Sequence, residues 1–324
     1  MHGLFGNGRR RHLRPGLSTP LRVRLLGTAA GGGFPQWNCN CALCRQSRQG
    51  KEGVRARTQS AAAVSADGRA WFLLNLSPDV RHQIEAFEPL RPPPDSVRGT
   101  PIEGALLTNA DLDHVLGIFI LREGGVLHLH APPAVRQALD QGLRISEVLK
   151  AYGGVAWHEP PPSLEPLLKS DGTESGLLYQ AFEVPGKLPR YAGSRALPGS
   201  AVGYLLMDEN TKGKLAFLPD VADLPLKVLE NLADCQALLL DGTFWDEDEM
   251  PKTGTGRLTA SEMAHLPLGG PEGSLEILRQ LPVPRKIYLH INNTNPILDA
   301  SSPEYRKVRE AGVEVGMDGM EFEL

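Results

Sequence analysis

The sequence predicts an α+β fold in which β-sheets pack on each other and helices lie outside them. Strand and helix candidates are interspersed along the 324 residues, with hairpin-like sections between them. Two late segments, Ala237–Asp241 and Lys286–His290, are nearly continuous apolar runs, which is typical of strands buried on both faces. The length fits one large domain or two smaller ones. Because no long linker or internal repeat divides the chain, we expect a single domain over residues 21–324.

Short-range patterns predict the elements in chain order. The first strand, Leu21–Gly27, alternates in polarity and leads into Gly31-Gly32-Gly33, which indicates a tight loop. Further strands are expected at Trp71–Asn75, Gly104–Leu107, Val126–His130, Leu177–Val184, Val202–Met207, Lys214–Pro219, Ala237–Asp241 and Lys286–His290. Helices are expected at Val115–Arg122, Pro133–Gln141, Pro225–Leu232, Ser261–His265, Gly273–Gln280 and Ser302–Glu310. Pro185–Gly199 is rich in Pro, Gly and Arg, so we interpret it as a surface loop, with a lid as one possible role.

The first 20 residues differ in composition from the rest. They contain Arg9, Arg10, Arg11 and Arg14 without an acidic residue, and no apolar segment follows, so they do not resemble a secretory signal. We expect residues 1–20 to be a disordered basic extension or the result of a start site placed too early, with a basic docking arm as the alternative. The net charge of −4 gives no support to nucleic-acid binding, and no apolar stretch reaches the roughly 20 residues of a membrane span.

Three of the four cysteines lie within six residues, in Cys39-Asn40-Cys41-Ala42-Leu43-Cys44. Such spacing is typical of a metal site rather than a disulfide framework, and it indicates a reducing, cytoplasmic location. Three sulfur atoms on one tight loop can converge on a tetrahedral zinc ion at about 2.3 Å each, and a closed site of this kind is structural. The fourth ligand stays open between Cys235, Asn293 and water.

A second cluster, Asn109-Ala110-Asp111-Leu112-Asp113-His114, directly follows the apolar run of a predicted strand. His290 ends another predicted strand. Together Asp113, His114 and His290 supply one carboxylate and two imidazoles, the facial triad suited to non-haem Fe(II) with open positions for oxygen and substrate. Zinc or another divalent ion could occupy the same ligands, since ligand type alone does not determine the metal.

Four more residues are candidates near this metal site. Asp220 closes a strand and is a candidate further ligand that could bridge two ions. Asp241 also ends a strand, and we expect it to orient a ligating imidazole. His265 is a candidate acid, base or substrate contact, with a structural histidine as the equal alternative. Asp111 either ligates the metal or caps the following helix.

Several blocks of the sequence resemble one family. The opening Gly27-Thr28-Ala29-Ala30-Gly31-Gly32-Gly33-Phe34-Pro35-Gln36-Trp37-Asn38-Cys39-Asn40-Cys41 is similar to that of the pyrroloquinoline quinone (PQQ) biosynthesis protein B family. Further similar blocks follow in order: Arg57-Thr58-Gln59-Ser60, Ser77-Pro78-Asp79, Leu121-Arg122-Glu123-Gly124, Asp241-Gly242-Thr243, His290-Ile291-Asn292-Asn293-Thr294-Asn295-Pro296 and Met317-Asp318-Gly319-Met320. The Asn109–His114 cluster also resembles the metallo-β-lactamase signature His-x-His-x-Asp-His, with Asn109 and Asp111 in place of its first two histidines.

The resemblance implies a metallo-β-lactamase-like αββα four-layer sandwich. It implies a structural zinc on the cysteines and an active-site metal on Asp113, His114 and His290. The implied activity is hydroxylation of the tyrosine ring in the Glu–Tyr cross-linked unit of a precursor peptide, within the cytoplasm of PQQ-making bacteria. An older assignment for the family is a non-catalytic carrier that moves PQQ or its precursor towards the periplasm. The expected partners are therefore the peptide-derived PQQ precursor and other PQQ biosynthesis proteins.

The residues themselves favour oxygenation over hydrolysis. A hydrolytic zinc pair uses both metals to activate water and to hold the leaving group. Asn109 is a poor replacement for an imidazole, and no histidine occurs between His158 and His265 to supply the usual middle ligand. A metal-dependent hydrolase remains the third hypothesis, because Asp220 adds a carboxylate that the triad does not need.

Four residues are candidate contacts for the carboxylates of such a substrate, through charge or amide hydrogen bonds: Arg57, Gln59, Asn292 and Asn293. A loop-stabilising role is the alternative for each of them.

Overall fold

The computed structural model describes residues 20–324, whose strands form two seven-stranded sheets. The first sheet contains β1 (Arg22–Gly27), β2 (Ala61–Ser65), β3 (Trp71–Leu74), β4 (Ile102–Leu106), β5 (Leu127–His130), β6 (Val155–His158) and β14 (Glu321–Glu323). The second contains β7 (Glu165–Leu168), β8 (Glu174–Glu183), β9 (Val202–Asp208), β10 (Lys214–Leu218), β11 (Ala237–Asp241), β12 (Arg285–Leu289) and β13 (Val313–Val315). The basic extension expected at residues 1–20 falls almost entirely outside the described residues.

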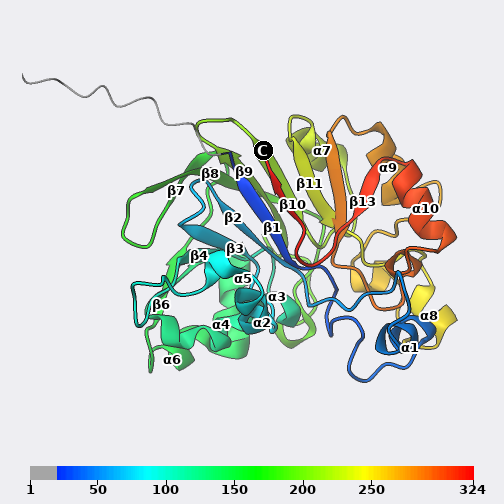
Figure 1. Cartoon of the computed structure of the whole chain (residues 1–324), viewed down its shortest axis with the longest axis horizontal. Coiled ribbons are helices and arrows are strands. Elements are labelled where there is room, and N and C mark those ends of the chain that lie inside the picture. Colours follow the sequence, from blue (N-terminus) through cyan, green and yellow to red (C-terminus); the bar gives the residue numbers. More distant parts are fainter. Residues whose placement is uncertain (1–19) are drawn as a thin grey trace, which may run out of the picture.

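Helices cover the outer faces of both sheets, as an αββα sandwich requires. Within residues 20–324 the α-helices are α1 (Ala42–Arg48), α2 (Val80–Glu85), α3 (Leu112–Val115), α4 (Gly117–Ile120), α5 (Pro133–Ala138), α6 (Ile145–Leu149), α7 (Leu226–Leu232), α8 (Glu249–Thr253), α9 (Ser274–Gln280) and α10 (Pro303–Glu310). Figure 1 shows α2 to α6 gathered on one side of the paired sheets and α7, α9 and α10 on the other. The predicted fold class is therefore confirmed. No described helix is long and apolar enough to cross a membrane.

Each sheet is mixed, and its parallel half leads to one edge. The first sheet has the order β14-β1-β2-β3-β4-β5-β6, and β3 to β6 run parallel. The second has the order β13-β12-β11-β10-β9-β8-β7, and β10 to β13 run parallel. Because β10, β11 and β12 are neighbours with the same direction, the residues that follow their carboxyl ends lie side by side. Asp220, Asp241 and His290 occupy those positions.

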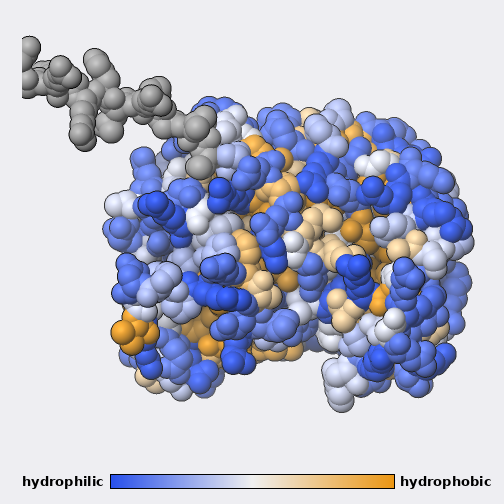
Figure 2. Space-filling model, in the orientation of Figure 1, coloured by the Kyte–Doolittle hydropathy of each residue, from blue (hydrophilic) through white to orange (hydrophobic). Residues whose placement is uncertain are grey.

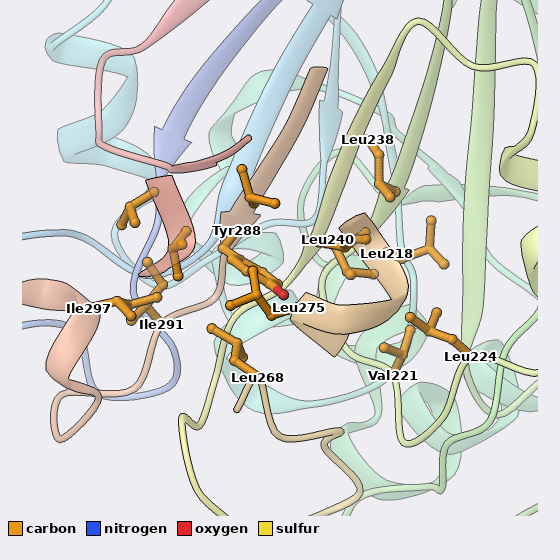
Figure 3. Close-up of a cluster of buried hydrophobic side chains, with 14 of the residues drawn as sticks. Leu218, Val221, Leu224, Leu238, Leu240, Leu268, Leu275, Tyr288, Ile291 and Ile297 are labelled. Carbon is orange, nitrogen blue, oxygen red and sulfur yellow. The ribbon is translucent and has the colours of Figure 1, made fainter. Parts of the chain in front are cut away.

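Three apolar cores hold the four layers together. Phe72, Tyr204 and Phe217 are fully buried between the two sheets. A second core lies between the first sheet and its helices. The third lies beneath α7 and α9, where Tyr288 of β12 points among leucines of the neighbouring strands (Figure 3) and its hydroxyl bonds Ser274 at 2.8 Å. Figure 2 shows that the outer surface in this view is mostly hydrophilic, with hydrophobic side chains visible mainly over the strands between the helical layers.

Some expected elements differ from the structure for local reasons. The helix expected at Val115–Arg122 forms two short helices, α3 and α4. Gly117 begins α4 pressed against backbone, because a Cβ there would lie 2.5 Å from the carbonyl oxygen of Ser77. The helix expected at Ser261–His265 is only a three-residue 3₁₀ turn, Ser261–Met263. The loop expected at Pro185–Gly199 is confirmed, apart from the 3₁₀ turn Arg190–Ala192.

Candidate metal centre

The polar residues that follow four strand ends surround one cavity of about 280 Å³. After β4 the chain turns into α3, which carries Asp113 and His114. After β10, β11 and β12 come Asp220, Asp241 and His290. The cavity is lined directly by Asp113, Asp220 and His290. The structure therefore brings together residues that are far apart in the sequence around one cavity.

Asp113, His114 and His290 form a group with the dimensions of a metal site. The Oδ2 atom of Asp113 lies 3.0 Å from Nε2 of His290 and 3.8 Å from Nε2 of His114. His114 is fully buried, yet its Nε2 atom has no hydrogen-bond partner among the described residues. A buried nitrogen with an unused lone pair is costly unless something binds it. A divalent cation next to Asp113 would satisfy it, so the residues present fit a metal ion.

Hydrogen bonds to the other ring nitrogen set the tautomer of both histidines. Nδ1 of His114 lies 3.1 Å from Oδ1 of Asn109, which is a pure acceptor. Nδ1 of His290 lies 2.8 Å from the hydroxyl of Thr243, and that hydroxyl lies 2.5 Å from Oδ1 of Asp241. Because Thr243 donates to the carboxylate, it accepts from Nδ1–H of His290. Each imidazole thus keeps a proton at Nδ1, and each Nε2 atom faces Asp113, where it becomes a metal ligand once it carries no proton.

A second group, Asp220, His265 and His290, has similar dimensions. Asp220 lies 3.2 Å from Nδ1 of His114 and 3.2 Å from Nδ1 of His290, on the side of both rings away from Asp113. His265 uses its own Nδ1 on Asp241, at 2.7 Å. Among the described residues no hydrogen bond joins Asp220 to either ring: its Oδ2 accepts from Nδ2 of Asn109, and its buried Oδ1 has no hydrogen-bond partner. Asp220 thus contacts both imidazoles on the side away from Asp113, whereas Asp241 is joined to His265 by a direct hydrogen bond.

The electrostatics of the metal group suit a cation. Burial alone would raise the pKa of Asp113, but His114 and His290 lower it below its ordinary value. Burial would lower the pKa of His290, but Asp220 and Asp113 raise it to about 10. Burial, together with Asp220 and Asp113, raises the pKa of Asp111 to about 7. Asp111 lines the cavity at the N-cap position of α3, although its side chain makes no capping bond. The excess of carboxylates holds a proton on His290 that a metal ion would displace.

The cysteine cluster lies beside Asn293, which follows His290 by three residues in the chain. Cys39, Cys41 and Cys44 bring their sulfur atoms within 4.8 Å of one another. The side-chain amide of Asn293 stands over them, with Nδ2 at 3.2, 3.7 and 3.5 Å from the three sulfurs in that order. Cys235 is buried in the core and directs its thiol to the carbonyl of Asn231 instead. Of the candidate fourth ligands, Asn293 is at the cluster and Cys235 is not.

Three of the four expected substrate contacts lie outside the cavity: Asn293 stands over the cysteine sulfurs, and Arg57 and Gln59 lie elsewhere. Arg57 is buried and bonds the hydroxyl of Thr28 at 3.1 Å and the carbonyl of Gly316, and burial lowers its pKa to about 10. Gln59 accepts from the backbone of Gly32 and donates to Asp79. Neither Arg57 nor Gln59 lines the cavity. The polar groups of Arg57 and Gln59 form hydrogen bonds between loops. The structure therefore favours the loop-stabilising role over substrate binding for both residues.

Asn292 does line the cavity, and a short chain of hydrogen bonds orients it. Its Nδ2 donates to the hydroxyl of Thr294 at 2.5 Å, and Thr294 donates to Glu249 at 2.5 Å. Burial raises the pKa of Glu249 to about 7, although bonds from Thr294 and Trp245 lower it. The fixed amide leaves Oδ1 of Asn292 as its free acceptor. Asn292 therefore remains a candidate substrate contact.

Sequence reasoning missed several residues of the site. Thr243 carries no charge, and only its place in the Asp241-Gly242-Thr243 block marked it. Asn109 was regarded as a lost ligand, but it orients His114. Lys187 and Arg190 line the cavity from the loop 185–199. Their only signal was the basic composition of that loop, which does not reveal which way it folds.

Comparison with known proteins agrees with the fold and the resemblance. The family model of the β-lactamase superfamily domain matches residues 70–291. Coenzyme PQQ synthesis protein B of Methylococcus capsulatus is 42% identical over 313 residues, which cover 93% of this chain and 99% of that protein. The protein of the same name from Pseudomonas putida strain W619 is 41% identical over 310 residues, with the same coverage of 93% and 99%.

Solved structures give the same result. The crystal structure of Zn²⁺-bound PqqB from Methylobacterium extorquens superposes with a TM-score of 0.85 at 35% identity, covering 94% of this chain and 100% of that one. A diphosphatase of the PhnP family has a TM-score of 0.64 at 18% identity, covering 95% and 98% of the two chains. The second likeness concerns the fold alone.

Proposed function

Because the chain belongs to the coenzyme PQQ synthesis protein B family of the β-lactamase superfamily, we propose that it acts in PQQ biosynthesis as a non-haem Fe(II) oxygenase. The substrate is the Glu–Tyr cross-linked precursor made by other PQQ biosynthesis proteins, and the reaction hydroxylates its tyrosine ring. The observation that carries this proposal is the group of one carboxylate and two Nε2 lone pairs on Asp113, His114 and His290 beside a cavity. Three protein ligands on one side leave further positions for small molecules.

An Fe(II) ion on Asp113, His114 and His290 would supply the oxygen chemistry that no side chain provides. The chain's own residues do the positioning. Asp220 lies 3.2 Å from Nδ1 of each ligating imidazole and supports both by charge, and Thr243 with Asp241 fixes His290 through hydrogen bonds. We assign Asp220 to this supporting role rather than to a second ion.

His265 lines the cavity with its Nδ1 bound to Asp241, so Nε2 is its free atom. Burial would lower the pKa of His265, but Asp241 and Asp220 raise it. These carboxylates favour the protonated imidazole, whose Nε2–H would point to the cavity and could be donated to an oxygen of the substrate. We propose that His265 is the catalytic acid, that Asp241 positions it, and that Asn292 contacts the substrate.

The cysteine cluster is proposed as a structural zinc site. Rotation of the Asn293 amide by 180° would place Oδ1, a hard ligand, where Nδ2 now faces the sulfurs. Asn293 would then be the fourth ligand after Cys39, Cys41 and Cys44. The free cysteines agree with our proposal that the protein works in the reducing cytoplasm.

Two other functions make different predictions. A carrier of PQQ or its precursor would bind its ligand tightly without metal-dependent turnover. A hydrolase is favoured by one observation, the second group around Asp220, and would need two metal ions.

The test is oxygen uptake by anaerobically purified, metal-stripped protein reloaded separately with Fe(II) and Zn(II). The substrate is a cross-linked or free tyrosine analogue, and mass spectrometry follows the products. We expect iron-dependent uptake with added oxygen atoms, and its loss in His290→Ala but not in His128→Ala, which lies outside the cavity. No uptake with either metal would reject the oxygenase. Tight PQQ binding would then favour the carrier, and turnover with two zinc ions the hydrolase.

A further inference from the structure

We infer that Arg190 binds a carboxylate of the ligand in the metal cavity and is the residue that selects carboxylated substrates. The inference rests on the proposed function in one respect, since the metal centre is the other point at which the substrate is held. It concerns a residue of the loop 185–199 that lies outside the metal group.

Apart from the histidines, the charged residues that line the cavity are three aspartates near the metal group, which we call its floor, and Lys187, Arg190 and Glu262, which we call its wall. Asp111, Asp113 and Asp220 make the floor acidic. Lys187 and Arg190 are the two permanently cationic side chains among the cavity-lining residues, and both come from the loop 185–199. A bound cation on the floor would neutralise much of its negative charge. The wall then remains the place where an anionic group of a ligand gains most.

Lys187 is already occupied. Its ammonium group donates to the backbone carbonyl of Glu262, which lines the cavity on a different segment. The lysine thus joins two parts of the cavity wall. Because its ammonium group already has an acceptor, Lys187 would gain less from binding an anionic ligand than a cation without a partner would.

Arg190 is unoccupied. Within residues 20–324 its guanidinium makes no hydrogen bond or ion pair that the structure records, and the residue is exposed. A guanidinium presents parallel N–H groups that match a carboxylate in a bidentate bond.

The backbone of Arg190 is held in place. The next residue, Tyr191, donates its hydroxyl to the carbonyl of Ala110 at 2.6 Å, on the segment that carries Asp113. The ring of Tyr191 packs on Gly142, where a Cβ would lie 2.4 Å from it. The carbonyl of Arg190 accepts from Gly193 at 3.1 Å. The backbone of Arg190 is therefore held at a fixed position relative to Asp113, as selective recognition of a substrate requires.

Binding of PQQ itself, a tricarboxylate, tests the inference, with its trimethyl ester as the uncharged probe. Affinity is measured by calorimetry on the zinc-loaded full chain for the wild type, Arg190→Ala and Arg190→Lys. Arg195→Ala is the matched control, because Arg195 lies on the same loop and lines a different cavity. We expect Arg190→Ala to weaken PQQ binding about tenfold or more, Arg190→Lys to restore part of it, and Arg195→Ala to change it less than twofold. The ester should bind weakly and equally to all four.

Equal PQQ affinity of the wild type and Arg190→Ala would overturn the inference, as would absence of PQQ binding to the wild type. Thermal unfolding of Arg190→Ala should match that of the wild type, which excludes misfolding as the cause of a loss. Failure of the proposed function looks different. Loss of PQQ affinity in Arg190→Ala without any iron-dependent oxygen uptake supports this inference and rejects the oxygenase. Oxygen uptake with an unchanged KM in Arg190→Ala does the reverse.

Discussion

Thr243→Val tests how the ligating histidine is oriented. Thr243 is buried, and its hydroxyl joins Nδ1 of His290 at 2.8 Å to Asp241 at 2.5 Å. Valine keeps nearly the same shape but removes the oxygen. His290 then loses the acceptor that holds its proton at Nδ1, so Nε2 is no longer fixed as the ligand atom.

Loss of such a supporting hydrogen bond weakens metal binding by about 10- to 100-fold. This corresponds to about 1.4 to 2.7 kcal/mol of binding free energy. The buried carboxylate of Asp241 also loses a donor, so the free energy of unfolding should fall by about 1 to 3 kcal/mol. Thr243→Ser keeps the hydroxyl and should behave nearly as the wild type in both respects.

Titration with Mn²⁺, followed by electron paramagnetic resonance of the free ion, measures the affinity. Mn²⁺ prefers carboxylate and imidazole ligands, so the cysteine cluster does not compete for it. An affinity of Thr243→Val within twofold of the wild type would refute the assignment of Thr243 and the tautomer derived from it. His290→Ala should bind no Mn²⁺ at this site.

The other predictions concern zinc, pH and the core. Asn293→Ala should lower the zinc content of the purified protein, and Cys235→Ser should leave it unchanged; metal analysis that finds the reverse would exclude Asn293 as the fourth ligand. Burial, with His158 and His128, lowers the pKa of His130 to about 3, whereas an unfolded histidine titrates near 6.5. Between about pH 6.5 and 3, this histidine is therefore protonated in the unfolded chain but neutral in the folded protein. The free energy of unfolding should fall as the pH decreases through this range, by up to about 1.4 kcal/mol per pH unit. Urea unfolding at several pH values should show a smaller slope in His130→Phe than in the wild type, and an identical slope would contradict the assignment. Phe217→Ala opens the core between the sheets and should cost about 3 to 5 kcal/mol in urea unfolding, against no measurable change for Val97→Ala on the surface.

The sequence was informative about the two candidate metal sites because two local signals were strong. Asp113, His114 and His290 each lie at or shortly after the end of a predicted strand and carry metal-binding side chains, and the structure brings the three together. The close spacing of Cys39, Cys41 and Cys44 was a local signal of the same kind.

Other features depend on contacts between distant parts of the chain. β14 pairs with β1 through Val23 and Phe322, and no local pattern reveals such a partner. The alanine-rich β2 is fully buried, but Val64 is its single β-branched residue, so its strand signal is weak. Arg57 was predicted at the substrate because of its charge, yet the fold turns it into the interior. Arg190 reaches the cavity only because its loop folds over the metal group.

The most direct test of the account is anomalous diffraction at the iron absorption edge from crystals of the Fe(II)-loaded protein. The account predicts one iron peak between Oδ2 of Asp113 and the Nε2 atoms of His114 and His290. It predicts no peak between Asp220 and His265. An iron ion bound there, or one coordinated through Nδ1 of His290, would contradict the single-metal centre from which the proposed function is argued.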